Sequence, residues 1–461
     1  MIYSIKRLAD PKNSSPGWWT IDGKITGLNE WHDEAAKSGT TDYSKPIAGL
    51  KAADRYTLQI TLNKPSFQFL YSLAMSFTSV VPHEAVEKYG KDFINHPVGT
   101  GPFKLTEFNP SSKLVWDKNP TYRNEVYPSE GTSEDRDQGN LADAGKSLPL
   151  VDRIVVEIFE EQQPKWLNFM SGKLDVAGVP KDNFDSAVGK DGGLQPELKA
   201  KNMRLMKVPE LGLTHFTFNM DDPIIGKNKY LRQAISLAHD ANHELQLFYN
   251  GQGIVAQGPI PPGLAGYDPA MKNPYNQFNI EKAKELLAKA GYPGGKGLPP
   301  LDVPTQSDST TRQQTEFFEK EMNTIGIQLK VDPGSWPQFQ EAIKNKKGQL
   351  WSWGWSADYP DAEDFLMMFY SKNVSPGAND ANYRNPEFDK LYEKSLTLPD
   401  SPQRTAIYQQ MVKILVEECV WIFDNHRLVI SVGQPWMKNY KYSDAGHDVY
   451  KYYGIDPALK K

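Results

Sequence analysis

The chain has 461 residues, too many for a single hydrophobic core, which predicts two or three domains. A hydrophobic fraction of 39%, with 24% charged and 11% aromatic residues, is typical of a folded globular protein and excludes a disordered chain. The net charge of -5 is spread along the sequence without a basic block, which indicates that neither nucleic acid nor an anionic membrane is a partner.

The apolar stretches and the chain start carry little sign of a membrane segment. The longest apolar runs, around Phe69–Pro82 and Ile414–Phe423, are too short and too interrupted to span a bilayer. Met1–Ala9 lacks the apolar core of a signal peptide, and no lipid-accepting cysteine follows it. The single cysteine, Cys419, lies inside the second apolar run, so we expect a buried structural thiol and not a nucleophile.

The first half of the chain alternates predicted strands, helices and loops without an internal repeat. Residues 10–50 are rich in Pro, Gly, Ser and Trp and predict an irregular segment, and Asn124–Ser147 is polar and predicts an exposed insertion. Alternating apolar residues predict strands at Tyr56–Leu62, Phe103–Phe108, Val151–Phe159, Lys173–Val179, Arg204–Val208 and His215–Asn219. Helical spacing predicts helices at Phe67–Phe77, Pro82–Tyr89, Gln163–Met170 and Lys229–Ala238.

Two short motifs suggest sites that their surroundings do not support. Gly99 and Gly101 form a glycine-rich turn, but a strand and not a helix follows, so a phosphate cradle is not expected. His239 and His243 are four residues apart, which could place two imidazoles on one helix face. The glutamate of the metalloprotease pattern HExxH is absent and no third ligand is evident, so we expect a solvated helix end there.

From residue 251 onward the chain predicts an α/β lobe. Gly251–Pro269 is a loop, and Asn279–Ala290 is a helix with Asn279 as its N-cap and Gly291 as its stop. The alternation that follows indicates a mostly parallel sheet, whose ligands lie beyond the carboxyl ends of the strands. The elements are strands at Leu301–Thr305, Ile327–Val331 and around Trp351–Trp355, and helices at Thr311–Ile325 and Trp336–Asn345.

The segment Leu350–Phe369 concentrates the unusual chemistry of the chain. Trp351, Trp353 and Trp355 are two residues apart, so in a strand their side chains leave by the same face. Pro360 ends that strand, and helical spacing resumes after it. A tryptophan-rich strand can equally be part of a core, so this pattern alone leaves both interpretations open.

Asp358 is the candidate binding residue of this segment. It lies in the strand-to-helix turn beside aromatic side chains, with no Lys or Arg between Leu350 and Tyr370. A carboxylate against indole rings suits an organic cation such as an ammonium group. Ordinary turn chemistry is the alternative for Asp358, and helix capping is the expected role of Asp361.

Three groups of segments resemble the family 5 extracellular solute-binding proteins, which deliver peptides to ABC importers. The first group is YSIKRLADPK, KAADRYTLQITLNKPSFQFLY and HPVGTGPFKL; the second is HFTFNMDDP followed by YLRQAISLAHD; the third is WGWSADYPDAEDFL followed by ANYRNPEFDKLYEKSL. The resemblance covers nearly the whole chain in the family's order, although no single motif would suffice.

This resemblance implies an α/β, two-lobed periplasmic-binding-protein-like fold (type II, cluster C) with an extra subdomain and a hinge between the lobes. The implied domains are an extra subdomain at 1–97, lobe one at 98–247, lobe two at 248–425, and a return to lobe one at 426–461. It further implies a monomer that binds peptide and docks on an ABC permease, outside the cytoplasmic membrane, with no catalytic residue, no metal and no cofactor.

The resemblance also implies roles for individual residues. In peptide-binding relatives the aspartate of the W-x-A-D-Y motif, here Asp358, pairs with the ligand's α-ammonium, and the motif tryptophan is Trp355. The asparagine of the F-N motif, here Asn219, would contact the ligand backbone from the other lobe. Trp353 and Tyr359 are expected to complete the aromatic walls of the site.

Two departures from the family pattern limit these expectations. Relatives carry a signal sequence and a further part of lobe one before the YSIKRL helix, so a chain that starts at this helix is expected to be truncated. Some relatives have an arginine for the ligand carboxylate three residues before the motif tryptophan, where this chain has Ser352. A fixed peptide length is therefore not expected.

Three other functions stay open at this point. An oligosaccharide or another solute could bind the same fold against its tryptophans. A glycoside hydrolase could use Asp358 with Asp361 or Glu363 as its pair of carboxylates. The chain could also be a remnant that binds nothing.

Overall fold

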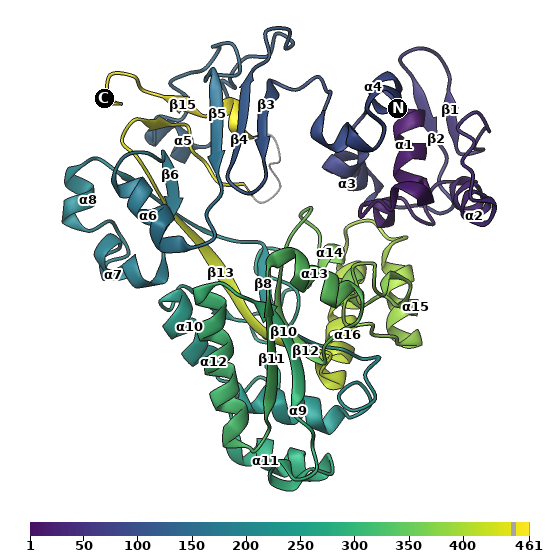
Figure 1. Cartoon of the computed structure of the whole chain (residues 1–461), viewed down its shortest axis with the longest axis vertical. Coiled ribbons are helices and arrows are strands. Elements are labelled where there is room, and N and C mark those ends of the chain that lie inside the picture. Colours follow the sequence, from purple (N-terminus) through teal and green to yellow (C-terminus); the bar gives the residue numbers. More distant parts are fainter. Residues whose placement is uncertain (444–448, 461) are drawn as a thin grey trace.

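The computed structural model describes residues 1–443 and 449–460. Three bodies are visible in Figure 1: an N-terminal body at the upper right, a second body at the upper left, and a large lower body. The strand β13 (Trp421–Gly433) runs from the lower body into the upper left one. Within the described residues, no helix is long and apolar enough to cross a membrane.

The N-terminal body folds around an apolar cluster of its own. Ile5, Ile21, Leu28, Trp31 and Phe69 are all buried in this cluster, which includes no residue beyond Leu73. The body supports the predicted extra subdomain, residues 1–97, which we retain as a proposal. Its elements are α1 (Ile2–Ala9), α2 (Leu28–Ser38), β1 (Leu50–Ala52), β2 (Leu58–Ile60), α3 (Phe69–Ala74) and α4 (His83–Tyr89).

The upper left body, lobe one, combines an antiparallel meander with short helices around a second cluster. Phe169, Ala187 and Val432 are fully or almost fully buried there. The strands β3 (Phe103–Asn109), β4 (Lys113–Lys118) and β5 (Arg153–Glu157) pair in sequence order. The remaining elements are α5 (Ser133–Asp137), α6 (Gln162–Met170), β6 (Val176–Gly178), α7 (Phe184–Ala187), α8 (Pro196–Ala200), β7 (Arg204–Pro209), β14 (Met437–Lys438) and β15 (Gly454–Ile455).

The lower body, lobe two, is built on a sheet with an apolar cluster on each face. On β13, Trp421 and Phe423 face one cluster and Ile422 faces the other, as the two-residue period of a strand requires. The strands are β8 (Gly212–Phe218), β9 (Gly253–Val255), β10 (Leu301–Gln306), β11 (Leu329–Gly334) and β12 (Leu350–Ser356). The helices are α9 (Lys229–Ala238), α10 (Ala241–Tyr249), α11 (Ile280–Lys289), α12 (Ser309–Thr324), α13 (Trp336–Lys344), α14 (Glu363–Leu366), α15 (Pro386–Ser395) and α16 (Pro402–Glu418).

Several helices predicted from apolar spacing form where expected, whereas the helix predicted at Phe67–Phe77 is shortened to Phe69–Ala74. The helix predicted at Lys229–Ala238 has those bounds in the structure, and its apolar stripe is buried against α11. Asn279 caps α11, because its side chain accepts a hydrogen bond of 2.9 Å from the amide of Lys282. Cys419 is buried as predicted, and burial raises its pKa to about 12, which leaves the thiol inert.

The prediction of a mostly parallel sheet in lobe two is wrong. Among the named strands of the described part of lobe two, only β10 and β11 pair in parallel, whereas β8 pairs antiparallel with both β12 and β13. Every residue of β8 is buried, including the polar Thr214, His215 and Thr217, so both faces of this antiparallel strand are covered. Strand direction depends on partners more than a hundred residues away, and apolar spacing does not reveal it.

Two segments cross between the lobes. The first half of β13 pairs with β8 in lobe two, and from Leu428 onward the strand pairs with β7 in lobe one. The second crossing is the short link between β7 and β8. Because β8, α9 and α10 pack within lobe two, we propose that lobe two begins near Gly212 and not at residue 248.

Candidate functional site

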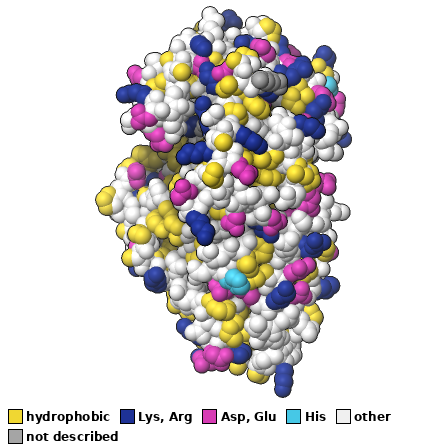
Figure 2. Space-filling model, turned by 90° about the vertical axis from the view of Figure 1, so that its left-hand side faces the viewer, with side chains coloured by type: hydrophobic (Ala, Val, Ile, Leu, Met, Phe, Trp, Pro, Cys, Tyr) yellow, Lys and Arg dark blue, Asp and Glu magenta, His cyan; other side chains and the backbone are white. Residues whose placement is uncertain are grey.

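The turn between β12 and α14 lies where lobe two meets the crossing segments. The last strand residue is Ser356, and the next amide, of Ala357, donates a hydrogen bond of 2.7 Å to the carbonyl of Leu211 in the β7–β8 link. Asp358 follows and is half-buried. Figure 2 shows a hollow between the upper and lower parts of the molecule, edged by hydrophobic side chains and by Lys or Arg.

A buried carboxyl, Asp364, organises this turn. Its side chain is fully buried, and its Oδ2 accepts hydrogen bonds from the indole Nε1 of Trp355 at 3.0 Å and from the backbone amide of Asp358 at 2.9 Å. Asp364 therefore fixes both the ring of Trp355 and the position of Asp358. Asp364 lies in the first turn of α14, a position where acidic residues are common, so its sequence position alone does not reveal this role.

The structure brings Asp358 and Trp355 together through this shared carboxyl. The negative charge of Asp358 is close enough to raise the pKa of Asp364, adding to the larger effect of burial. Trp355 lies partly exposed beside it, against the apolar cluster that contains Ala357 and Phe365. A carboxylate beside an indole ring at the mouth of the turn is the expected receptor for a cation.

Trp353 and Tyr359 are committed to packing elsewhere. Trp353 stacks on Trp336 of α13, with ring centroids 5.4 Å apart. Tyr359 is buried, stacks on Tyr71 of α3 at 5.4 Å, and donates a hydrogen bond of 2.6 Å to Glu363. Tyr359 thus joins lobe two to the N-terminal body, and its role in ligand binding remains a prediction that these contacts do not favour.

Asn219 does not face Asp358 from the other lobe. It follows β8 at the end that pairs with Leu350, whereas Trp355 pairs with Leu213 at the opposite end of the same strands. Its amide donates to the carbonyls of Lys346 at 3.2 Å and Gly348 at 3.1 Å. The strand register contradicts the expected placement, because β8 and β12 are neighbouring strands of one sheet.

The two acidic residues of the hydrolase alternative are held by structural contacts. Asp361 accepts a hydrogen bond of 2.9 Å from the amide of Glu363 at the start of α14, as expected of a cap, and forms an ion pair of 2.7 Å with Arg404. Glu363 is buried and accepts hydrogen bonds from the hydroxyls of Tyr359 and Tyr392. Both carboxylates are therefore occupied by contacts within the protein.

A charged contact that the sequence does not predict lies at the lobe crossing. Glu210, in the β7–β8 link, is almost fully buried and forms an ion pair of 3.0 Å with Arg427 on β13. Its other oxygen accepts a hydrogen bond of 2.5 Å from the hydroxyl of Ser356 at the end of β12. One carboxylate thus connects both crossing segments to the strand that carries the candidate site.

We expect Asp364 to make stability depend on pH. Burial, aided by the charges of Asp358 and Glu363, raises its pKa well above the usual range of about 4. The folded state therefore keeps a proton that the unfolded chain releases, so stability is full below the unfolded pKa and falls as pH rises through the folded one. Asp364→Asn, which retains an acceptor oxygen, should flatten this fall when chemical unfolding is followed between pH 5 and pH 8. An unchanged slope in the variant would show that Asp364 is already ionised in the folded state.

Two α/β lobes joined by a continuous strand and a short link, with a charged aromatic corner at the crossing, define a two-lobed solute-binding protein. The sequence model for bacterial extracellular solute-binding proteins, family 5 (Middle), matches residues 1–377. The chain belongs to this family, which confirms the resemblance noted in the sequence. The family consists of binding proteins named for extracellular solutes.

Several curated proteins are similar over most of their length. Heme-binding protein A of Haemophilus influenzae is 25% identical over 417 residues, covering 89% of this chain and 70% of the relative. The dipeptide-binding protein of Escherichia coli is 23% identical over 402 residues, covering 86% and 69%. A probable di/tripeptide-binding protein 5 of Pseudomonas aeruginosa is 25% identical over 462 residues, covering 97% and 77%.

Solved structures confirm the fold. The murein tripeptide binding protein MppA of Escherichia coli superposes with a TM-score of 0.78 at 22% identity, covering 98% of this chain and 82% of that one. OppA of Burkholderia pseudomallei gives a TM-score of 0.79 at 18% identity, covering 99% and 83%. The α/β, two-lobed fold expected from the resemblance is therefore correct.

Proposed function

We propose that the chain is the substrate-binding component of an ABC importer, which captures peptides between its lobes and delivers them to a membrane permease. Membership of the solute-binding family supports this proposal, as do similar proteins whose names specify dipeptides and di- or tripeptides. The observation that carries it is the corner in which Asp364 holds both Trp355 and Asp358 beside the lobe crossing.

Binding in this proposal depends on the amino terminus of the peptide. Its ammonium group pairs with Asp358 over the face of Trp355, where a charge-assisted hydrogen bond is strengthened when closure removes water. Closure is a rotation about the β7–β8 link and the middle of β13, which the Glu210–Arg427 pair ties together. The protein performs no catalysis and acts as a monomer outside the cytoplasmic membrane.

The alternatives have less support from the described residues. Stacking platforms for an oligosaccharide would need exposed indole faces, but Trp351 is fully buried and Trp353 packs on α13. Hydrolysis of glycosides would need a second catalytic carboxylate, and the contacts of Asp361 and Glu363 leave neither in that role. Peptide binding, in contrast, needs only Asp358 and Trp355 in the positions that Asp364 gives them.

Titration calorimetry with matched peptides tests the proposal. We expect a library of di- to pentapeptides with free amino termini to contain ligands, and N-acetylation of the same peptides to weaken binding by at least about tenfold, since it removes the ammonium charge. Equal affinity for the acetylated forms would overturn the ammonium assignment. Binding of oligosaccharides in place of every peptide tested would overturn the peptide class.

A further inference from the structure

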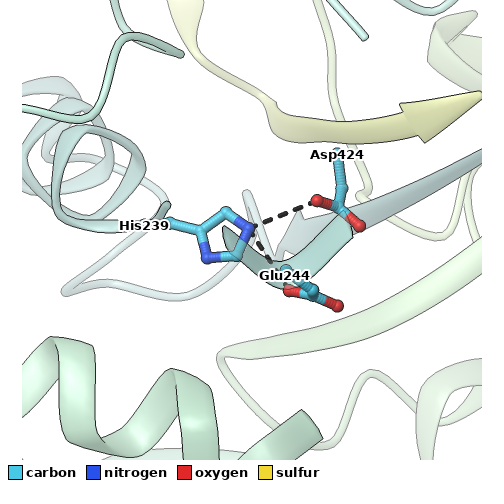
Figure 3. Close-up of side chains that lie close together, drawn as sticks. All are labelled: His239, Glu244 and Asp424. Atoms are coloured by element: carbon cyan, nitrogen blue, oxygen red, sulfur yellow. Dashed lines mark hydrogen bonds and ion pairs between the residues drawn. The ribbon is translucent and has the colours of Figure 1, made fainter. Parts of the chain in front are cut away.

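A second polar cluster lies inside lobe two, away from the proposed peptide site. His239, in the junction between α9 and α10, has a fully buried side chain. Its Nε2 lies 3.3 Å from Oδ1 of Asp424 on β13 and 3.4 Å from Oε2 of Glu244 on α10. Figure 3 shows both carboxylates converging on that one nitrogen. On the other side of the ring, Nδ1 lies 2.8 Å from Oε2 of Glu321 on α12.

The charges of this cluster do not balance within the described residues. Three carboxylates surround one imidazole, and the side chains of Glu244, Glu321 and Asp424 are at most 11% exposed. In residues 1–443 and 449–460, no lysine or arginine forms an ion pair with any of the three. Buried carboxylates without compensating positive charge cost several kcal/mol each. A proton or a bound cation must therefore offset the excess negative charge at this place.

One oxygen of the cluster has no hydrogen-bond partner. Oε2 of Glu244 is buried and unsatisfied although it points at Nε2 of His239, at a distance too long for a good hydrogen bond. Its other oxygen is held by the amide of Gln314 at 3.3 Å. The carboxylate is thus oriented by a neighbour while its second oxygen faces the space between the three ligand atoms.

The spacing of the ligand atoms fits a metal ion. Bonds of about 2.0–2.1 Å at tetrahedral angles place neighbouring ligand atoms about 3.3 Å apart, which is close to both distances measured from Nε2. The ligand atoms of His239, Glu244 and Asp424 all lie within 4.8 Å of one another. Nε2 and Oδ1 of Asp424 form a long hydrogen bond of 3.3 Å, whereas a charge-assisted one is typically about 2.7–2.9 Å.

The surroundings of the cluster have the features of a metal-site support. Glu321 accepts the Nδ1 proton of His239, which fixes the tautomer and leaves Nε2 as the coordinating nitrogen. The hydroxyl of Thr214 donates a hydrogen bond of 3.0 Å to the second oxygen of Asp424. Each ligand is therefore oriented by a further side chain.

We propose that His239, Glu244 and Asp424 bind a divalent transition-metal ion, with Zn²⁺ as the best fit to one imidazole and two carboxylates. A water completes the coordination shell. The ion supplies the missing positive charge and links the α9–α10 junction to β13 immediately before the strand crosses into lobe one. Its role is structural, because it holds the lobe-two end of the crossing segment in place.

His239 differs from the prediction made for it. The expected solvated helix end is wrong for His239, which is buried, although it holds for His243, which is exposed and packs edge-on against Phe317. The helical spacing of the two histidines was not informative, because α9 ends before His239 and α10 begins after it. The third ligand, Asp424, is 185 residues away in sequence.

Metal content and thermal unfolding of the full chain test the proposal. Protein purified without a metal-affinity step would be dialysed first against Zn²⁺ and then against metal-free buffer. Elemental mass spectrometry would then measure how many zinc ions each chain retains. We expect one Zn²⁺ per chain, a lower unfolding temperature after chelation, and recovery on adding Zn²⁺ but not Mg²⁺ or Ca²⁺. A chain that retains no zinc and unfolds at the same temperature in chelator would overturn the site and leave protons as the compensating charge.

Conservative variants locate the ion. Glu244→Gln and Asp424→Asn retain size and hydrogen-bonding oxygens, and each should weaken Zn²⁺ binding at least about tenfold in competition with a chromophoric chelator. His243→Ala is the matched control on the exposed histidine and should bind as the wild type does. Loss of zinc in the control with retention in both carboxylate variants would assign the ion to the surface and refute the buried site. If a variant does not fold, the number of zinc ions bound by the wild-type chain still tests the proposal.

Discussion

Replacing Asp358 with alanine is expected to abolish most peptide binding while the fold remains intact. Truncating one partner of a desolvated charge pair typically costs about 2–5 kcal/mol, which corresponds to a roughly 30-fold to several-thousand-fold weaker Kd. Asp358 is half-buried on a turn, and its backbone amide can still donate to Asp364 in the variant. Titration calorimetry with a peptide that binds the wild type measures the loss, and circular dichroism checks the fold.

Two further variants separate ligand binding from stability. Asp332→Ala removes an exposed carboxylate on β11 and should change neither property. Asn219→Ala removes the buried amide that bonds Lys346 and Gly348, so it should lower the free energy of unfolding by about 1–3 kcal/mol while affinity stays the same. A folded Asp358→Ala protein with wild-type affinity would contradict the assignment of Asp358. A folded Asn219→Ala protein with weakened affinity would restore the original expectation for Asn219.

Local elements of this fold were predictable because local periodicity determines them. The helix at Lys229–Ala238 and the cap at Asn279 follow from residues within a few positions of one another. Strand partners are set over long distances: β8 pairs with β12 and β13, whose sequences lie far along the chain. This is why the antiparallel sheet, and with it the start that we propose for lobe two, could not be derived from apolar spacing.

The candidate site was predictable to the extent that it is carried by one continuous segment. Trp355 lies at the end of β12 and Asp358 in the turn that follows, so their proximity followed from sequence. The contacts that hold them were not visible there, because Asp364 resembles any acidic residue in the first turn of a helix. Glu210 and Arg427 meet only because two distant segments cross between the lobes at the same place.

The resemblance to a family supplied what local chemistry could not. It indicated the two-lobed fold and singled out Asp358 among several acidic residues of one segment. It also suggested that Asn219 faces the site from the other lobe, which the strand register contradicts. A role transferred from a sequence motif is therefore valid only if the residue lies at the right end of its strand. The motif alone does not show which end that is.

Asp361→Ala is expected to cause the largest loss of stability among the acidic residues of this segment. Its side chain pairs with Arg404, which is only 5% exposed, and accepts a hydrogen bond of 2.9 Å from Tyr408. Removing one partner of a buried ion pair leaves the other charge uncompensated and costs about 3–5 kcal/mol. Chemical denaturation followed by tryptophan fluorescence should show a midpoint shifted to lower denaturant concentration.

The control for this prediction is an exposed ion pair on the same lobe. Asp302 and Lys330 are 53% and 73% exposed, so Asp302→Ala should cost no more than about 1 kcal/mol. The double variant Asp361→Ala with Arg404→Leu should be more stable than Asp361→Ala alone, because it removes the stranded guanidinium together with its partner. If Asp361→Ala unfolds at the wild-type midpoint, the pair does not stabilise the turn. Asp361 would then be available for the catalytic role that the glycoside hydrolase alternative gives it.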